Sequence, residues 1–310
     1  LLGTGPYRVA HADPGRRVIF ERVPDYWAGD LPTRKGQYNF DQMIFDFYRD
    51  DTVAFEAFKA GNLNFRRETN VNLWVKGYDF PRLQSGDVVA LRLPHHRAEM
   101  FRAFIPNTRR APFNDIRVRR ALSAVFDFDW VNKNLYAGML RRTTSLFPNT
   151  DLSAPLLPAS DSPESESVPL RDRMAQADRL LKSAGWLIRN GVRVHEKTGT
   201  ALQFEILLSS AADEKIALSF VRTLKKLGIA ARTRTMDVAA FRDRLNDYDF
   251  DMIFYGWPST LSPGGEQLLY FGCSAVNQPG QFNYAGMCDP AIDRIAGDIA
   301  KTTDRAALAQ

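Results

Sequence analysis

The spacing of apolar residues in the middle of the chain predicts alternating strands and helices. Phe204–Leu208 is a short apolar run, typical of a buried strand, and a helical stripe follows over residues 217–227 before Gly228. A second strand is predicted at Ile229–Thr235. A strand, a helix and a strand with short connections form a right-handed crossover between parallel strands. A helix at Val238–Leu245 and a strand at Phe250–Trp257 continue the alternation, so the pattern predicts an α/β protein with mixed sheets.

The same reasoning predicts further elements on both sides of this region. Asn190-Gly191 is a strong signal for a hairpin turn. Thr52 is expected to cap a helix over Asp50–Ala60, and Asn114 or Asp115 to cap another. The remaining predictions are strands at Tyr7–Ala10, Val18–Arg22 and Met43–Tyr48, a helix that stops at Gly185, a last helix that starts at Asp289-Pro290, and a long mobile loop over about 151–170 that is rich in Ser and Pro.

The length and composition suit a soluble two-lobed protein. The chain has 310 residues, which is enough for two domains or one large bilobed unit. No apolar run approaches the roughly 18 residues that cross a bilayer. The chain begins with Leu1 and stops within the helix-like residues 306–309. We therefore expect a fragment of a longer protein, and a signal peptide in the full-length form.

Charge and cysteines leave alternatives open. The net charge is +5, and residues 101–142 hold eight arginines and one lysine against three aspartates. This excess favours an anionic ligand or surface, or it is a solvated helix face; the sequence carries no nucleic-acid-binding motif. Cys273 and Cys288 form a disulfide in an oxidising compartment, or they are two separate thiols.

The sequence gives little support to catalysis. Motifs for phosphate binding, for a nucleophilic serine and for zinc are missing. His95-His96 is a candidate metal pair, but neighbours on a strand point to opposite faces. Asp249 and Asp251 share a face and are a candidate acid/base pair, or they make structural hydrogen bonds. We predict no enzyme, no cofactor and no metal, with a hydrolase as the alternative from another class.

A binding cleft has better support. Phe254, Tyr255 and Trp257 cluster where a predicted strand ends and runs into a loop rich in Ser, Pro and Gly over residues 258–265. Ligands of open α/β sheets lie beyond the carboxyl ends of strands. Aromatic walls with nearby hydroxyls suit a peptide or a small polar solute. The alternative is a packed aromatic corner followed by a connecting loop.

Eight segments in order along the chain resemble one family, the family 5 extracellular solute-binding proteins, which are receptors of peptide and nickel ABC importers. The segments are GTGPY (3–7), VPDYW (23–27), TVAFEAFKAGNLNF (52–65), the stretch from Asn107 to Tyr136, LLKSAGW (180–186), LKKLGI (224–229), YDFDMIFYGW (248–257) and DPAIDRIAGDIA (289–300). Two further segments, RRETNVNLWVKGYDFP and SPGGEQLLYFG, resemble the subgroup for microcin C and oligopeptides.

The resemblance implies a bilobed, type II periplasmic-binding-protein fold with an incomplete first lobe. Residues 1–102 and the return segment 259–310 would build the first lobe, residues 103–258 the second, and the crossings near Asn107 and Pro258 the hinge. It also implies a monomeric periplasmic receptor that closes around its ligand and docks on a membrane permease. No nucleic acid is expected among its partners.

The residues expected to bind the ligand are Phe104, Asn107, Arg109, Phe254, Tyr255, Trp257, Thr260 and Ser262. Arg109 would meet a ligand carboxylate, or it is a surface arginine. Oligopeptide receptors carry an aspartate at the position of Thr260, where it pairs with the amino terminus of the peptide. The threonine makes a blocked or modified peptide more plausible, and the alternative solutes are a sugar, an opine-like compound or a metal chelate.

Overall fold

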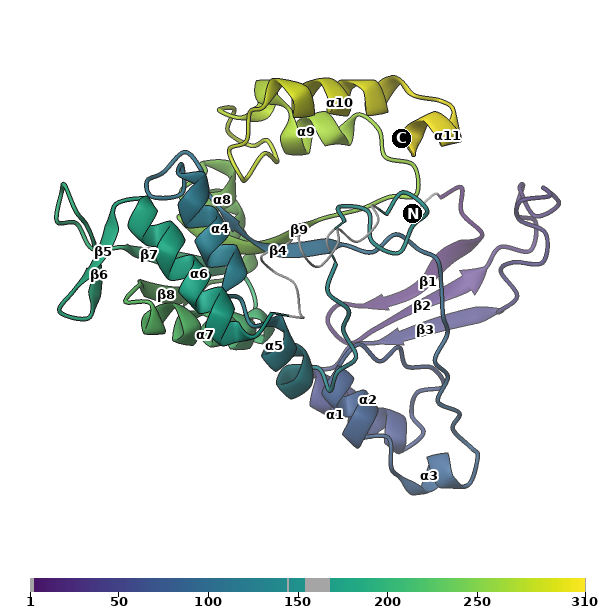
Figure 1. The fold of residues 1–310 in the computed structure, drawn as a ribbon. Coiled ribbons are helices and arrows are strands. Elements are labelled where there is room, and N and C mark those ends of the chain that lie inside the picture. Colours follow the sequence, from purple (N-terminus) through teal and green to yellow (C-terminus); the bar gives the residue numbers. More distant parts are fainter. Residues whose placement is uncertain (1–2, 144, 154–167, 310) are drawn as a thin grey trace. The chain divides into compact units, whose positions relative to one another are not determined.

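The computed structural model describes residues 3–143, 145–153 and 168–309, and the chain divides into two compact units, Leu1–Leu91 and Arg92–Gln310. The first unit is a three-stranded antiparallel sheet followed by three short helices (Figure 1). Its elements are β1 (Tyr7–Asp13), β2 (Arg17–Arg22), β3 (Gln42–Asp46), α1 (Asp51–Lys59), α2 (Val71–Lys76) and α3 (Pro81–Gln84).

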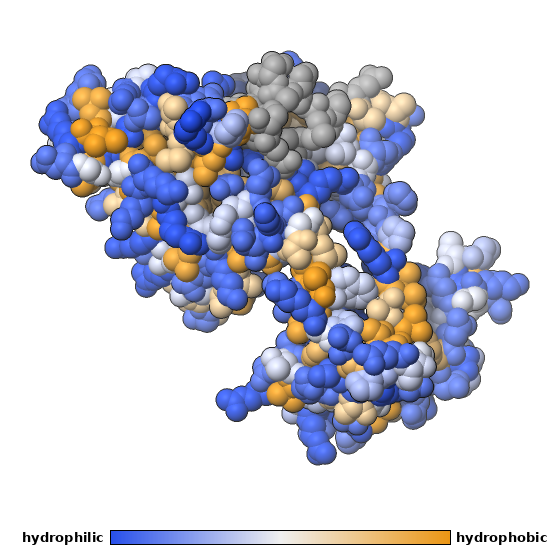
Figure 2. Space-filling model, turned by 60° about the horizontal axis from the view of Figure 1, so that its bottom comes forward, coloured by the Kyte–Doolittle hydropathy of each residue, from blue (hydrophilic) through white to orange (hydrophobic). Residues whose placement is uncertain are grey.

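The first unit buries few large side chains. Phe55, Phe58 and Phe80 form its cluster of buried residues. By contrast Phe40 is 69% exposed and Phe65 is 82% exposed. In the view of Figure 2, apolar side chains form separate patches on a surface that is largely hydrophilic. Several large apolar side chains of this unit are therefore not used in its own core.

The cap of α1 differs from the prediction. The side chain of Asp50 accepts a hydrogen bond from the backbone N–H of Val53 at 3.0 Å, so Asp50 is the N-cap and Thr52 lies inside the helix. Aspartate and threonine both cap helices well, and here the N-cap is the aspartate that lies two residues before the predicted threonine. For the later helix α4 (Ile116–Ala124), Asp115 is the N-cap, and it is one of the two residues predicted for this role.

The second unit is built on a four-stranded sheet of order β4-β9-β7-β8. Two of the three pairings, β7 with β8 and β7 with β9, are parallel, and the edge strand β4 lies antiparallel to β9. The predicted crossover is confirmed, because α7 connects the parallel strands β7 and β8. The elements are β4 (Phe101–Pro106), β7 (Gln203–Leu208), α7 (Ala211–Lys226), β8 (Ala230–Thr235), α8 (Val238–Asn246) and β9 (Met252–Trp257).

Each face of this sheet has its own core. Buried residues of α4, α6 (Leu170–Ser183) and α7 pack on one face with Ile206 and Met252, and α8 packs on the other face with Leu207 and Ile253. Since consecutive residues of a strand point to opposite faces, β7 and β9 contribute to both cores. The sheet is thus buried on both sides, as parallel sheets generally are.

The remaining elements surround this frame. The predicted hairpin is confirmed, with Asn190 and Gly191 in the left-handed region at φ 50° and 78°. Most of the loop expected over about 151–170 lies outside the described residues, and α6 starts at Leu170. These elements are α5 (Phe128–Leu135), β5 (Trp186–Arg189), β6 (Val192–His195), α9 (Glu266–Phe271), the 3₁₀ turn η1 (Cys273–Ala275), α10 (Pro290–Lys301) and α11 (Arg305–Leu308).

Two further observations concern the cysteines and the length of the helices. Cys273 and Cys288 form a disulfide, which decides between the two alternatives left open by the sequence. No helix in the described ranges combines the length and the apolar character needed to cross a bilayer.

Candidate functional site

The aromatic residues at the end of β9 do not share one wall. Tyr255 and Trp257 point to the side of α8, where Trp257 packs against Tyr284 and Phe271 and is 7% exposed. The indole N–H of Trp257 donates to the carbonyl of Phe282 at 3.0 Å. The polar edge of this ring therefore already has a partner within the protein, and the ring belongs to a packed aromatic cluster.

Phe104 and Phe254 lie on the opposite face of the sheet. They are register partners on β4 and β9, and their ring centroids are 4.7 Å apart. Phe104 also packs against Phe126 and Phe220, at the edge of the core formed by α4, α6 and α7. The structure thus brings Phe104 and Phe254 together but separates them from Tyr255 and Trp257.

Asn107 and Arg109 use their polar atoms within the protein. Asn107 is 1% exposed, and its amide donates to the carbonyls of Tyr248 and Phe250, both at 3.0 Å. The guanidinium of Arg109 stacks on the ring of Tyr248 at 3.8 Å and donates to several backbone carbonyls. The carbonyl acceptors belong to Val276, Asn283 and Tyr284. Burial lowers the pKa of Arg109 from its ordinary value. A ligand carboxylate would have to displace carbonyls that Arg109 already holds.

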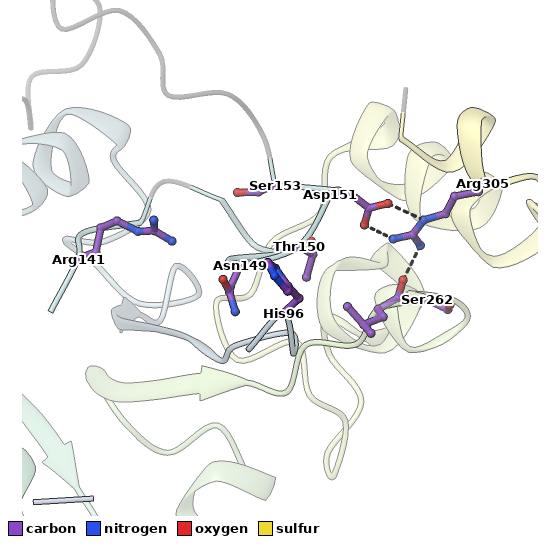
Figure 3. A pocket seen from close by; sticks show the side chains of 9 residues that line it. His96, Arg141, Asn149, Thr150, Asp151, Ser153, Ser262 and Arg305 are labelled. Carbon is purple, nitrogen blue, oxygen red and sulfur yellow. Dashed lines mark hydrogen bonds and ion pairs between the residues drawn. The ribbon is translucent and has the colours of Figure 1, made fainter. Parts of the chain in front are cut away.

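The two predicted hydroxyl residues are placed differently. Thr260 and Ser262 are exposed and have no hydrogen-bond partner in the part of the chain that the structure describes. Ser262 lines a hollow of about 730 Å³, shown in Figure 3. The other residues around this hollow are His96, Arg141, Asn149, Thr150, Asp151, Ser153, Leu261 and Arg305.

The charges around this hollow do not balance. The carboxylate of Asp151 accepts hydrogen bonds from two nitrogens of Arg305, with the Nε contact at 2.9 Å, and this guanidinium holds the pKa of Asp151 below its usual range. Arg141 lies across the hollow and has no ion-pair partner among the described residues (Figure 3). The hollow therefore offers one uncompensated guanidinium, together with the imidazole of His96 and the hydroxyls of Ser153 and Ser262.

Sequence reasoning missed most of this lining. His96, Arg141, Asp151 and Arg305 lie in separate parts of the chain, and only the fold brings them together. The one available signal was the cationic excess over residues 101–142, which includes Arg141. Nothing local distinguishes Arg141 from the other arginines of that stretch.

The candidate catalytic and metal pairs have other surroundings. Arg110 donates to Asp249 at 2.9 Å and to Asp251 at 3.0 Å, and Asp251 also accepts from the backbone N–H of Glu205. These contacts match the structural interpretation of the two aspartates. His95 and His96 are not part of any group of three or more possible metal ligands within the described ranges.

The family of the chain follows from comparison with known proteins. Residues 1–278 match the model of the bacterial extracellular solute-binding proteins, family 5. The chain belongs to this family. Among its relatives, a protein of Brucella suis biovar 1 that is named as a binding protein is 38% identical over 330 residues, which cover 98% of this chain and 53% of the relative. The YejA protein of Agrobacterium fabrum, whose name describes peptide binding, is 34% identical over 330 residues, with 98% and 54% covered.

Solved structures of other proteins show the same fold. The oligopeptide-binding protein AppA from Bacillus subtilis, solved with a nonapeptide, gives a TM-score of 0.74 at 21% identity, and the match covers 98% of this chain and 56% of AppA. NikA from Brucella suis, solved with Fe(III)-EDTA, gives 0.71 at 22% identity, with 99% and 58% covered. The type II fold expected for this family is therefore confirmed. The family 5 chain described here spans about half the length of the curated relatives that it matches.

Proposed function

We propose that the protein is the periplasmic receptor of an ABC importer and that it captures peptides, including peptides with a blocked amino terminus. Membership of family 5 supports the receptor class. The observation that carries the choice of solute is the hollow beside Ser262, which follows the carboxyl end of β9 and presents an unpaired guanidinium. Ligands of α/β sheets generally bind at this end of the strands.

The chemistry of the lining favours the acidic end of a peptide. Arg141 is a guanidinium without a carboxylate partner in the described residues, whereas Asp151 is neutralised by Arg305. A carboxylate that accepts hydrogen bonds from Arg141 would make charge-assisted contacts worth about 1.5–3 kcal/mol. The exposed position of Arg141 reduces this value through solvent screening.

The amino end of the ligand has no such partner at Thr260. The resemblance to oligopeptide receptors implies an aspartate at this position, and the side chain of Thr260 offers an uncharged hydroxyl instead. An acetylated or otherwise blocked amino terminus loses no ion pair there. Hinge closure between the proposed lobes, residues 1–102 with 259–310 and residues 103–258, would then trap the peptide and present the closed form to the permease.

A set of four peptides tests this function. One sequence is made with a free or acetylated amino terminus and with an acid or amide carboxyl terminus, and binding to the full-length protein is measured by calorimetry. We expect the acetylated acid to bind as well as the free acid, and the amides to bind about 10-fold more weakly. Arg141→Gln should remove the preference for the acid, and Arg171→Gln, a change at a 91% exposed arginine, should not.

Failure to bind any member of a diverse peptide library would overturn the peptide receptor. An anionic metal chelate is the second candidate, because the cationic lining would suit it equally well and because NikA was solved with Fe(III)-EDTA. Thermal stabilisation by the chelate and not by peptides would favour this alternative, since only a ligand that binds the folded state raises its stability.

A further inference from the structure

The second unit begins with a stretch that has neither helix nor strand. The two units meet in the sequence at Leu91 and Arg92, and regular structure starts only with β4 at Phe101. Every residue of this connector, residues 92–100, is exposed or half-buried. Because a segment without regular structure can adopt many conformations, its position has to be set by contacts with the rest of the unit.

One turn supplies such contacts. The side-chain amide of Asn149 donates to the carbonyl of His95 at 3.0 Å and to the carbonyl of Arg97 at 2.9 Å. The backbone N–H of Glu99 donates to the carbonyl of Pro148 at 3.2 Å. These three hydrogen bonds, which form a clamp, tie the connector to the turn, although Asn149 lies 54 and 52 residues beyond the two carbonyls that it holds.

The turn that carries Asn149 is itself held in place. Asn149 has a left-handed backbone at φ 60°, which asparagine adopts more readily than most residues other than glycine. The hydroxyl of Thr150 donates to the carbonyl of Phe147 at 2.8 Å and accepts from the backbone N–H of Leu152 at 3.2 Å. The amide of Asn149 is therefore presented to the connector from an ordered turn.

The clamp and the proposed ligand site share a wall. Asn149, Thr150 and His96 all line the hollow beside Ser262, and Figure 3 shows His96 next to Asn149. His96 lies between the two residues whose carbonyls Asn149 holds. If the connector leaves the turn, His96 leaves with it, and the hollow loses part of its wall. A ligand that fills the hollow therefore binds the clamped conformation better than the released one.

We infer that Asn149 is a positioning residue, whose clamp on the connector couples occupancy of this hollow to the segment through which the two units are joined. The coupling rests on the receptor function proposed above, whereas the clamp does not. A ligand shifts an equilibrium only by its difference in affinity for the two states, and the effect is reciprocal. The peptide should therefore stabilise the clamp by the same factor by which loss of the clamp weakens peptide binding.

Hydrogen exchange of the full-length protein without ligand, followed by mass spectrometry, tests the clamp. Asn149→Gly removes the amide and accepts the left-handed backbone without strain, and Asn149→Asp keeps the size of the side chain but cannot donate. Both variants should make the fragments that cover residues 92–100 exchange about 10-fold faster.

Asn134→Asp is the matched control for these variants. It introduces the same charge as Asn149→Asp and removes a contact of the same kind, from the amide of Asn134 to the carbonyl of Trp130 on α5. It should leave the exchange of the connector unchanged. Exchange at the wild-type rate in both Asn149 variants would overturn the clamp.

The same measurement with the acetylated peptide acid tests the coupling. The peptide should slow exchange of the connector about 3- to 10-fold in the wild type and in Asn134→Asp, and much less in Asn149→Gly, which adds no charge to the hollow. A peptide that binds the wild type but leaves the connector unchanged would overturn the coupling. If no peptide binds, the receptor function fails and the coupling fails with it, while the comparison without ligand still decides the clamp.

Discussion

At the scale of single residues, one guanidinium holds two carboxylates in the second unit. Arg110 bridges Asp249 and Asp251, and the hydrogen bond from Arg110, with a further contribution from Arg244, holds the pKa of Asp249 below its ordinary value of 3.8. The deprotonated form of Asp249 is thus favoured in the folded protein. Arg110 follows β4, and the two aspartates precede β9 or lie next to it, so these ion pairs connect the segment after β4 to the start of β9.

This arrangement predicts a pH effect for Asp249→Asn. A lowered pKa in the folded state means that Asp249 contributes its full stability above pH 3.8 and loses it as the pH falls through the folded pKa. The variant should therefore lose less stability than the wild type on acidification. Because the side chain of Asp249 is 56% exposed, the difference should be small, roughly 0.2–1 kcal/mol.

Urea unfolding at a series of acidic pH values measures this difference. Asp243→Asn is the matched control, because Asp243 is an exposed aspartate on α8 with no ion pair in the described part of the chain. It should follow the wild-type curve. Equal acid sensitivity of the wild type and Asp249→Asn would contradict the role of Arg110.

The sequence indicated which polar residues lie near the ends of strands, but it did not indicate which groups their side chains would bind. Asn107 and Arg109 stand out in the sequence as polar residues beside a predicted strand, but their donors turn out to hold backbone carbonyls 141 to 175 residues further along the chain. Such contacts depend on the whole fold and have no local pattern. Ser262, in contrast, was singled out by a local signal, a loop after an aromatic strand end, and its exposed side chain lines a hollow.

At the scale of elements, the disulfide closes the segment between α9 and α10. Cys273 lies in η1 and Cys288 lies just before the cap of α10, 15 residues later. The enclosed segment provides the carbonyls of Val276, Asn283 and Tyr284 that accept hydrogen bonds from Arg109. The bridge and the guanidinium therefore fix the same segment.

Reduction of this bridge should destabilise the protein by about 3 kcal/mol, because closing a loop of about 15 residues restricts the unfolded chain by that amount. Urea unfolding with and without dithiothreitol measures the effect. The double variant Cys273→Ser with Cys288→Ser should start from the lower stability and show no response to the reductant. A wild type that is equally indifferent would argue against the bridge.

Elements with local signals were the best predicted. The crossover β7-α7-β8, the hairpin at Asn190-Gly191 and the start of α10 at Pro290 each depend on periodicity or turn chemistry within a short window. The strand order of the four-stranded sheet, and the split of Phe254 from Trp257 between two cores, require long-range packing that the sequence does not display.

At the scale of the whole molecule, the described chain has two compact units, which meet in the sequence at Leu91 and Arg92. The first unit is held by the cluster of Phe55, Phe58 and Phe80, and the second by the two cores on its sheet. Separate cores allow separate unfolding transitions. The lobes proposed above for hinge closure, residues 1–102 with 259–310 and residues 103–258, divide the chain at other positions than these two units.

A pair of core variants tests this division. Phe80→Ala, at a side chain that is 4% exposed, should destabilise the first unit by about 3–5 kcal/mol, and Leu224→Ala, at 0%, the second by about 2–5 kcal/mol. Hydrogen exchange followed by mass spectrometry should show faster exchange only in the unit that carries the change. Faster exchange in both units after either substitution would mean that they unfold as one.

The unbonded side chains of Thr260 and Ser262 have a consequence for divergence within the family. A substitution at either position breaks no hydrogen bond in the described structure and opens no cavity, so it should be nearly neutral for folding. If these two side chains contact the solute as proposed, selection or an engineer could exchange them, and so alter which solute is preferred, at little cost to folding. The rings and carbonyl contacts just before them, at Trp257, carry the opposite constraint and would hold the frame constant while the recognition surface drifts.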